Sequence, residues 1–247
     1  MSEVKLILGD CLEVMKEMPD KSVDAVVTDP PYELGFMGKK WDDTGIAYQV
    51  EMWAEVMRVL KPGGHLLSFG GTRTYHRMVC AIEDAGFEIR DQIQWLYGSG
   101  FPKSYNIGKN CDGWDGWGSA LKPANEPICV VRKPLSEKTI VENVLKWGTG
   151  GINIDGCRVE LNGEIVPINK LEEWSGFGQL KRPDYEVTQN IQGRFPANVI
   201  LDEEAGRLLD EMSGEEHAAL WTAGALSSSV EWRDVRALAG ECLKLFS

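Results

Sequence analysis

The stretch VDAVVTDPPY, residues 23–32, decides most of what can be inferred about the fold. Its first five residues are mostly apolar and include three valines, which is typical of a short strand buried in a parallel sheet. Asp29, Pro30, Pro31 and Tyr32 follow this strand at once. Ligands of open α/β sheets bind at the carboxyl ends of the strands. The tetrapeptide therefore lies where a functional site is expected.

Strand and helix signals alternate around this stretch. The expected strands cover residues 4–8, 23–27, 65–69, 87–97, 128–131 and 195–201, with a short strand pair at 152–161. The expected helices cover residues 12–18, 47–60, 72–85 and 137–146. Residues 98–126 are rich in Gly, Pro, Asn and Trp and show no sustained period, which indicates an irregular insert. This order predicts an α/β protein with a doubly wound sheet.

The composition of the 247 residues is that of an ordinary soluble globular protein, with 43% hydrophobic and 26% charged residues. No apolar run approaches the roughly 20 residues that cross a bilayer, and the polar start does not resemble a secretory signal. We therefore expect a cytoplasmic protein without membrane contact. The six cysteines and three histidines form no paired ligand motif, so no metal site is expected.

The formal net charge of −12 is unevenly distributed. Residues 98–135 carry five basic and three acidic side chains, whereas residues 201–247 carry four basic and ten acidic ones. A polyanion is therefore expected to bind the middle of the chain and to avoid the tail.

The chemistry of residues 29–32 suits an amino group attached to a planar ring. The carboxylate of Asp29 accepts hydrogen bonds, and the two prolines stiffen the loop and lack N–H donors, so that nearby carbonyls can point outward. Tyr32 offers a flat face for stacking. A proline-stiffened strand exit is the structural alternative, and the position directly after a buried strand favours function over it.

Residues 9–32, GDCLEVMKEMPDKSVDAVVTDPPY, resemble the DNA methyltransferases that modify exocyclic amines, N6 of adenine or N4 of cytosine. LKPGGHLLSFGGTRTYHRM, GFEIRDQIQWLYGSGFPKS, LKPANEPICVVRKPLSEKTIVENVLKWGTGGINIDGCRV and GRFPANVILD continue the resemblance in order, over about residues 4–202. The match is to the phage and prophage type in which the catalytic motif precedes the cofactor motif.

The resemblance implies a function and a set of site residues. Asp29, Pro30, Pro31 and Tyr32 would hold a base flipped out of double-stranded DNA, because an amine inside a paired duplex is inaccessible. S-adenosylmethionine would be the methyl donor, and the Asp-Pro-Pro-Tyr form favours adenine N6. The implied cofactor contacts are Asp10, Phe69 and Gly70. For Asp10 the alternative is a helix N-cap, and for Phe69 and Gly70 it is a plain turn.

Candidate DNA contacts lie in the insert. Lysines would bind phosphates and tryptophans would stack on bases, whereas the alternative for the tryptophans is packing within the insert. The candidates are Lys103, Lys109, Trp114, Trp117 and Lys122. The chain then divides into a catalytic α/β part (1–97), a target-recognition-like insert (98–126), the remainder of the methyltransferase-like domain (127–201) and an acidic tail (202–247).

One feature of the resembling enzymes is not found after residue 202. They carry a Phe-x-Gly-x-Gly turn there that wraps the cofactor, and no such turn occurs in residues 203–247. The resemblance therefore implies an incomplete sheet, either in a truncated chain or in one that a second chain completes. Two other functions stay open: a catalytically silent fragment that binds DNA or a partner, and a methyltransferase of protein glutamine, against which Asp29 and the long insert argue.

Overall fold

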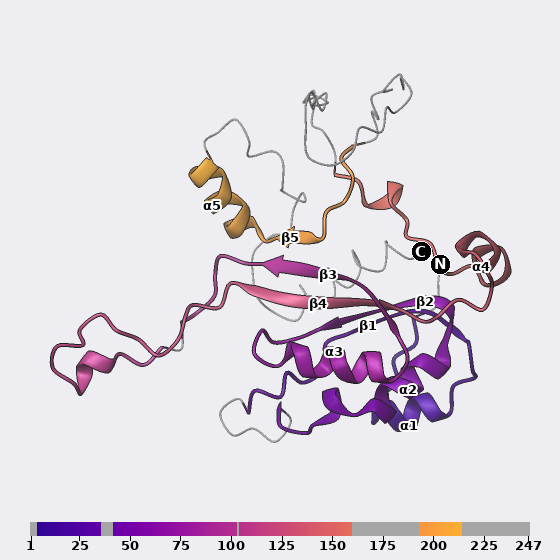
Figure 1. Ribbon diagram of the computed structural model, residues 1–247, viewed down its shortest axis with the longest axis horizontal. Helices are drawn as coiled ribbons and strands as arrows, with labels where there is room; N and C mark the ends of the chain where they lie inside the picture. Colours follow the sequence, from indigo (N-terminus) through magenta and orange to yellow (C-terminus); the bar gives the residue numbers. More distant parts are fainter. Residues whose placement is uncertain (1–3, 36–41, 103, 160–192, 214–247) are drawn as a thin grey trace, which may run out of the picture.

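A single mixed sheet organises the molecule (Figure 1). The computed structural model describes residues 4–35, 42–102, 104–159 and 193–213. The strands are β1 (Val23–Thr28), β2 (Leu60–Phe69), β3 (Glu88–Leu96), β4 (Asn125–Arg132) and β5 (Val199–Leu201), in the spatial order β1-β2-β4-β3-β5. β1 is parallel to β2 and β5 is parallel to β3, whereas β4 is antiparallel to both of its neighbours. The predicted α/β class is confirmed, with a sheet that is mixed.

The α-helices are α1 (Cys11–Lys16), α2 (Val50–Val59), α3 (Tyr75–Asp84), α4 (Ile140–Trp147) and α5 (Glu203–Ser213). Short 3-10 turns occupy Ile46–Tyr48, Ile107–Lys109 and Asp155–Cys157. None of the helices in the described ranges is long and apolar enough to cross a membrane.

Helices α1, α2 and α3 cover one face of the sheet (Figure 1). The apolar stripes of α2 and α3 pack on alternate side chains of β2 and β4, around the fully buried Trp53. The indole N–H of Trp53 donates to the carbonyl of Ala47 at 2.9 Å, which satisfies its polar atom inside the core. Burial of these stripes drives the helices onto this face.

The opposite face carries a smaller core that includes part of the candidate loop. Leu67 and Phe69 of β2, Ile93 of β3, and Ile128 and Val130 of β4 form it. Partly buried residues pack against this cluster: Val27, Tyr32, Trp95 and Ile200. Tyr32 is therefore anchored in apolar packing as well as by polar contacts.

Strand β2 begins at Leu60, five residues before the predicted strand, and includes Gly63. Gly63 has φ +82°, and a Cβ there would lie 2.5 Å from the amide nitrogen of Asn143. Asn143 is fully buried and bridges the carbonyls of Pro62 and Thr149 at 2.8 Å each. Only glycine fits this close approach. The stretch around Gly63 and Gly64, which resembles a turn in the sequence, is therefore part of strand β2.

Two predicted strand regions are not formed. Residues 4–8 are exposed and irregular, and they pair with no strand of the described sheet. The predicted pair at 152–161 is replaced by the 3-10 turn Asp155–Cys157 and a single bridge between Val159 and Arg194. The predictions of strands at these two places were wrong.

Residues 97–124 connect β3 to β4 as a long arm that projects from the body (Figure 1). The chain folds back on itself, with a bridge between Asn106 and Gly118 and an N–H···O bond of 3.0 Å from Ile107 to Trp117. The predicted irregular insert is thus a long arm of two chain segments that leaves the sheet at the ends of β3 and β4. Most of the predicted acidic tail lies outside the described residues.

Candidate active site

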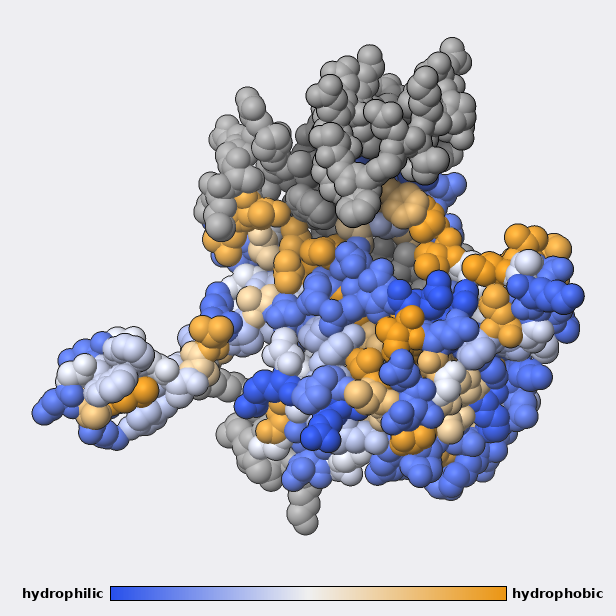
Figure 2. All heavy atoms as spheres, viewed as in Figure 1, coloured by the Kyte–Doolittle hydropathy of each residue, from blue (hydrophilic) through white to orange (hydrophobic). Residues whose placement is uncertain are grey.

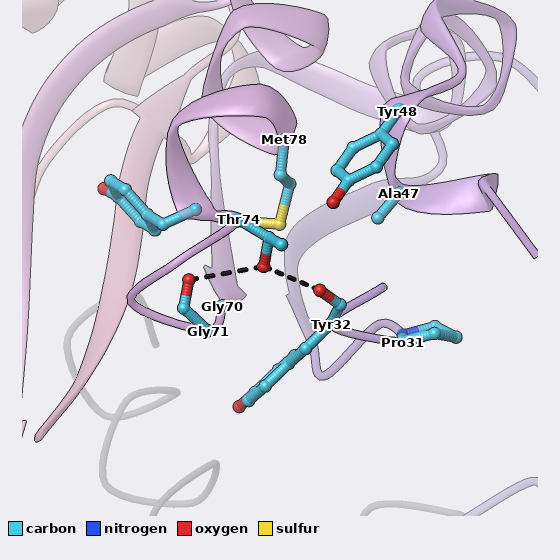
Figure 3. A pocket seen from close by; sticks show the side chains of 9 residues that line it. Pro31, Tyr32, Ala47, Tyr48, Gly70, Gly71, Thr74 and Met78 are labelled. Atoms are coloured by element: carbon cyan, nitrogen blue, oxygen red, sulfur yellow. Dashed lines mark hydrogen bonds between the residues drawn. The ribbon is translucent and has the colours of Figure 1, made fainter. Parts of the chain in front are cut away.

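Residues 29–32 follow the carboxyl end of β1 and form a loop that is anchored at the N-terminal end of α3. The hydroxyl of Thr74, which directly precedes α3, donates to the carbonyl of Tyr32 at 2.6 Å (Figure 3). Thr74 is the N-cap residue of α3, but its side chain does not cap the helix, because its hydroxyl donates to the carbonyl of Tyr32 instead. Asp29 remains exposed, whereas Pro30 is buried. The carboxylate is thus presented to solvent on a fixed backbone.

Glycines at the end of β2 let the Tyr32 ring approach the sheet. A Cβ on Gly71 would lie 3.2 Å from ring atom Cδ2 of Tyr32 and 3.3 Å from its Cβ. The cavity beneath the loop, bordered by Tyr32, Gly71 and Met78, has a volume of about 10 Å³, about one water. Figure 3 shows the Tyr32 ring pointing away from Tyr48 and Met78. This cavity is therefore too small for a purine ring.

The hydroxyl of Tyr32 donates to Oε2 of Glu126 at 2.7 Å. Glu126 lies on β4, 94 residues away in the sequence, and forms no ion pair within the described part of the chain. Burial and then the charge of Asp29 raise the pKa of Glu126, and the bond from Tyr32 opposes that rise. Burial, with Glu126 and Asp29 nearby, also raises the pKa of Tyr32, so its hydroxyl stays protonated as a donor.

Asp29 has a perturbed environment although part of its surface meets solvent. The surrounding packed atoms raise the pKa of its carboxyl above the ordinary value of 3.8, and interaction with the Tyr32 hydroxyl partly offsets this. Two carboxylates and one phenol therefore meet at the carboxyl end of β1, which is the arrangement of a site that binds a hydrogen-bond donor.

Aromatic rings line the sheet beside this polar group. Trp95 lies opposite Glu126 in the β3–β4 register. Its ring packs edge-on against Phe69, with centroids 6.5 Å apart, and at a tilt against Tyr97 at 5.7 Å. The indole nitrogen Nε1 of Trp95 is buried and has no hydrogen-bond partner among the described residues. The rings keep the carboxylates in a weakly polar setting.

The three residues predicted to contact a cofactor differ in their surroundings, and of these Gly70 lines the small cavity next to Tyr32. Asp10 is the N-cap of α1, and its Oδ1 accepts from the N–H groups of Leu12 at 2.9 Å and Glu13 at 3.2 Å. Phe69 is 2% exposed and belongs to the core, so its side chain faces no open site. Gly70 lies against α3, where an added Cβ would come within 3.1 Å of Met78. Their role in binding S-adenosylmethionine stays a prediction.

The candidate DNA contacts lie on the arm. Trp114 and Trp117 pack edge to face, with centroids 4.8 Å apart, and stay 43% and 59% exposed. Lys109 is exposed, whereas the ammonium of Lys122 donates to the carbonyl of Gly98 at the base of the arm. Lys103 lies outside the described residues. The two tryptophans thus pack on each other and still offer surface to a ligand.

Two of the five basic residues between positions 98 and 135 make their contacts inside the protein and not with solvent. Arg132 is buried and pairs with Glu88 at 2.6 Å, and Lys133 donates to the carbonyls of Met57 and Leu60. The number of basic residues in this stretch of sequence is therefore larger than the number that a bound polyanion could contact. Figure 2 accordingly shows the arm as a mixture of polar and apolar residues.

Glu126 and Thr74 are site residues that reasoning from the sequence missed. Both lie in segments that carry the family resemblance, but neither has a local pattern that marks it. Each reaches Tyr32 only through the fold, Thr74 from 42 residues away and Glu126 from 94.

Fold and site together define an α/β protein with an acidic, aromatic loop at the carboxyl end of a sheet strand. Residues 23–198 match the DNA methylase family of the N6/N4 type. Because this match covers more than half of the sequence, the chain belongs to that family.

Relatives by sequence include two type II methyltransferases. M.HindIII of Haemophilus influenzae is 33% identical over 116 residues, which is 42% of this chain and 38% of that protein. M.HpaI of Haemophilus parainfluenzae is 30% identical over 106 residues, 40% of this chain and 34% of that protein. The chain therefore spans well under half the length of the relatives it matches.

A solved structure with a partial match is TTHA0409 of Thermus thermophilus, described as a putative DNA modification methylase complexed with S-adenosyl-L-methionine. It is 26% identical, with a TM-score of 0.37, and the match covers 53% of this chain and 55% of that one.

Proposed function

We propose that this chain carries the catalytic loop of a site-specific DNA methyltransferase that modifies an exocyclic amine, with N6 of adenine as the favoured target. The observation that carries the proposal is Asp29, an exposed carboxylate beside Tyr32 at the carboxyl end of β1, in a chain of the DNA methylase family. S-adenosylmethionine, when bound, would supply the activated methyl group. Asp10, Phe69 and Gly70 are the contacts proposed for it.

The loop residues have distinct roles in this proposal. Asp29 accepts one N–H of the target amine, and the carbonyl of Pro30 accepts the other. Tyr32 stacks on the extruded base, while Pro31 stiffens the loop. With both N–H groups engaged by acceptors, the nitrogen lone pair is free to attack. The arm, with Lys109, Trp114 and Trp117, would contact duplex DNA beside the base, and Lys103 and Lys122 belong to the same proposal.

Asp29→Asn tests the role of the carboxylate, because the amide keeps the shape but replaces an acceptor oxygen with a donor. We expect methyl transfer to fall by at least about 100-fold, in line with the loss of a charged hydrogen-bonding group at a reacting centre. The measurement is transfer of tritium from labelled S-adenosylmethionine to PCR-amplified DNA of mixed sequence, which carries no modified base. Digestion and mass spectrometry then separate N6-methyladenine from N4-methylcytosine.

Asp24→Asn is the matched control, since Asp24 lies on the same strand and its carboxylate pairs with Lys61 at 2.5 Å, away from the loop. It should methylate at the wild-type rate. DNA binding without any transfer by the wild-type chain would support the silent fragment instead. Label in protein and not in DNA would support glutamine methylation.

A second chain that completes the sheet is the partner we propose besides DNA. β1 is the outer strand of the described sheet, and the apolar residues Val4, Leu6 and Leu8 are exposed. Unpaired edges and exposed apolar runs favour association. These two features support association with another chain.

A further inference from the structure

The Tyr32 hydroxyl has one proton and two neighbouring acceptors. A phenol donates a single hydrogen bond, and both Glu126 and Asp29 interact with this hydroxyl. In the structure the proton goes to Oε2 of Glu126 at 2.7 Å. The carboxylate of Asp29 is then left with its lone pairs available to another donor.

Glu126 is held in place by the sheet and not by a cation. It lies in β4, opposite Trp95 of β3, and the residue that follows it, Pro127, is buried. No Lys or Arg of the described ranges pairs with it. A half-buried carboxylate without a cation is unfavourable, so packing alone does not account for an acid at this position.

We propose that Glu126 is a positioning residue for methyl transfer: by accepting the Tyr32 hydroxyl, it keeps that donor away from Asp29 and leaves Asp29 free to bind the target amine. This inference rests on the proposed function, in which Asp29 holds the amine. Glu126 contacts neither the base nor the donor and acts only through Tyr32. The same bond fixes the ring on which the base stacks.

Removal of Glu126 would turn the hydroxyl toward the remaining acceptor. In Glu126→Ala the single proton of Tyr32 has only Asp29 to bind, and it competes there with the amine. We expect the methylation rate to fall about 10- to 100-fold, the effect of a competing hydrogen bond to a charged group. Glu126→Gln keeps an acceptor oxygen at the same place and should recover most of the rate.

The decisive experiment is the double variant. Tyr32→Phe removes the competing donor while keeping an aromatic face, so Tyr32→Phe/Glu126→Ala should methylate PCR-amplified duplex DNA faster than Glu126→Ala alone. If Glu126 serves only to pack the sheet, the second substitution gives no recovery. An equal or lower rate in the double variant therefore overturns the proposal.

A readout independent of activity separates this inference from the proposed function. The carboxyl carbon of Asp29 is titrated by ¹³C NMR in the full chain with labelled aspartate, and Asp29→Asn assigns the signal. Tyr32→Phe should raise the pKa of Asp29 far more in the Glu126→Ala background than in the wild-type background, because only there does the hydroxyl bind Asp29 alone.

Equal effects in both backgrounds would refute the inference even in a chain that methylates DNA. An unequal effect in a chain without methyl transfer would refute the proposed function and leave the hydrogen-bond competition established. Circular dichroism and urea unfolding of each variant show that the comparison is between folded proteins.

Discussion

Tyr32 shows how one residue acquires a role from partners that are distant in sequence. Its backbone carbonyl is held by Thr74 and its hydroxyl by Glu126, while its ring lies against Gly71. The sequence marked residues 29–32 because they are contiguous and follow a strand. It held no sign of the residues that fix them, since those contacts form only when separate strands and helices pack together.

Ionisation of the buried His65 should affect stability between pH 4 and 7. It is 4% exposed on β2, and burial, with the charges of Arg132 and Arg90, lowers its pKa from 6.5 to about 4. The unfolded chain therefore binds more protons than the native state in this window. Stability is present in full above pH 6.5 and falls as the pH drops toward 4, by about 3 kcal/mol for this group.

His65→Gln should flatten this dependence, because glutamine does not titrate. Urea unfolding at several pH values between 4 and 7.5 measures the slope of the free energy of unfolding. His76→Gln, an exposed position on α3, is the control and should keep the wild-type slope. If the two variants lose stability in parallel as the pH falls, the pH dependence of the free energy of unfolding does not come from His65.

At the scale of elements, the arm is separable from the sheet that carries it. Tyr97 and Ala124 are still joined by an N–H···O bond of 2.9 Å where the arm leaves β3 and β4. A two-residue Gly-Asn turn closes such an antiparallel pair and keeps Gly98, where a Cβ would clash with Glu204. Replacing residues 99–123 by a single Asn should therefore leave the far-ultraviolet circular dichroism and the cooperative unfolding transition in place, while DNA binding is lost.

Fluorescence anisotropy with a labelled DNA duplex measures the loss of DNA binding. The double variant Trp114→Ala/Trp117→Ala, in the intact arm, tests whether these two tryptophans are the contacts. We expect the double substitution to weaken binding by about 10-fold or more, the scale of losing an aromatic stacking contact. Undiminished affinity in the arm-deleted protein would place the DNA elsewhere on the molecule.

Over the whole molecule, apolar residues divide into a buried core and a set left outside it. Leu67 of β2 is 0% exposed, whereas Leu6 is 92% exposed. Leu67→Ala should cost about 2–5 kcal/mol of unfolding free energy through lost burial and a cavity. Leu6→Ser should change it by less than about 0.5 kcal/mol, as expected of an exposed site.

Chemical denaturation at two protein concentrations tests this pair and the proposed second chain together. A cost for Leu6→Ser that grows with protein concentration would show that another chain covers residues 4–8. A large cost at every concentration would show instead that these residues pack within the monomer.

The sequence by itself determined most of the local elements and marked residues 29–32 as the candidate loop. The valine-rich strand before Asp29 and the apolar stripes of α2 and α3 follow from periodicity within a few residues, which any fold containing them preserves. Tertiary structure decided the rest: the mixed strand order, the internal use of Arg132 and Lys133, and the meeting of Tyr32 with Glu126. These features depend on which strands become neighbours in the sheet. Strand pairing brings together residues that are far apart in the sequence, and no local sequence pattern predicts such pairs.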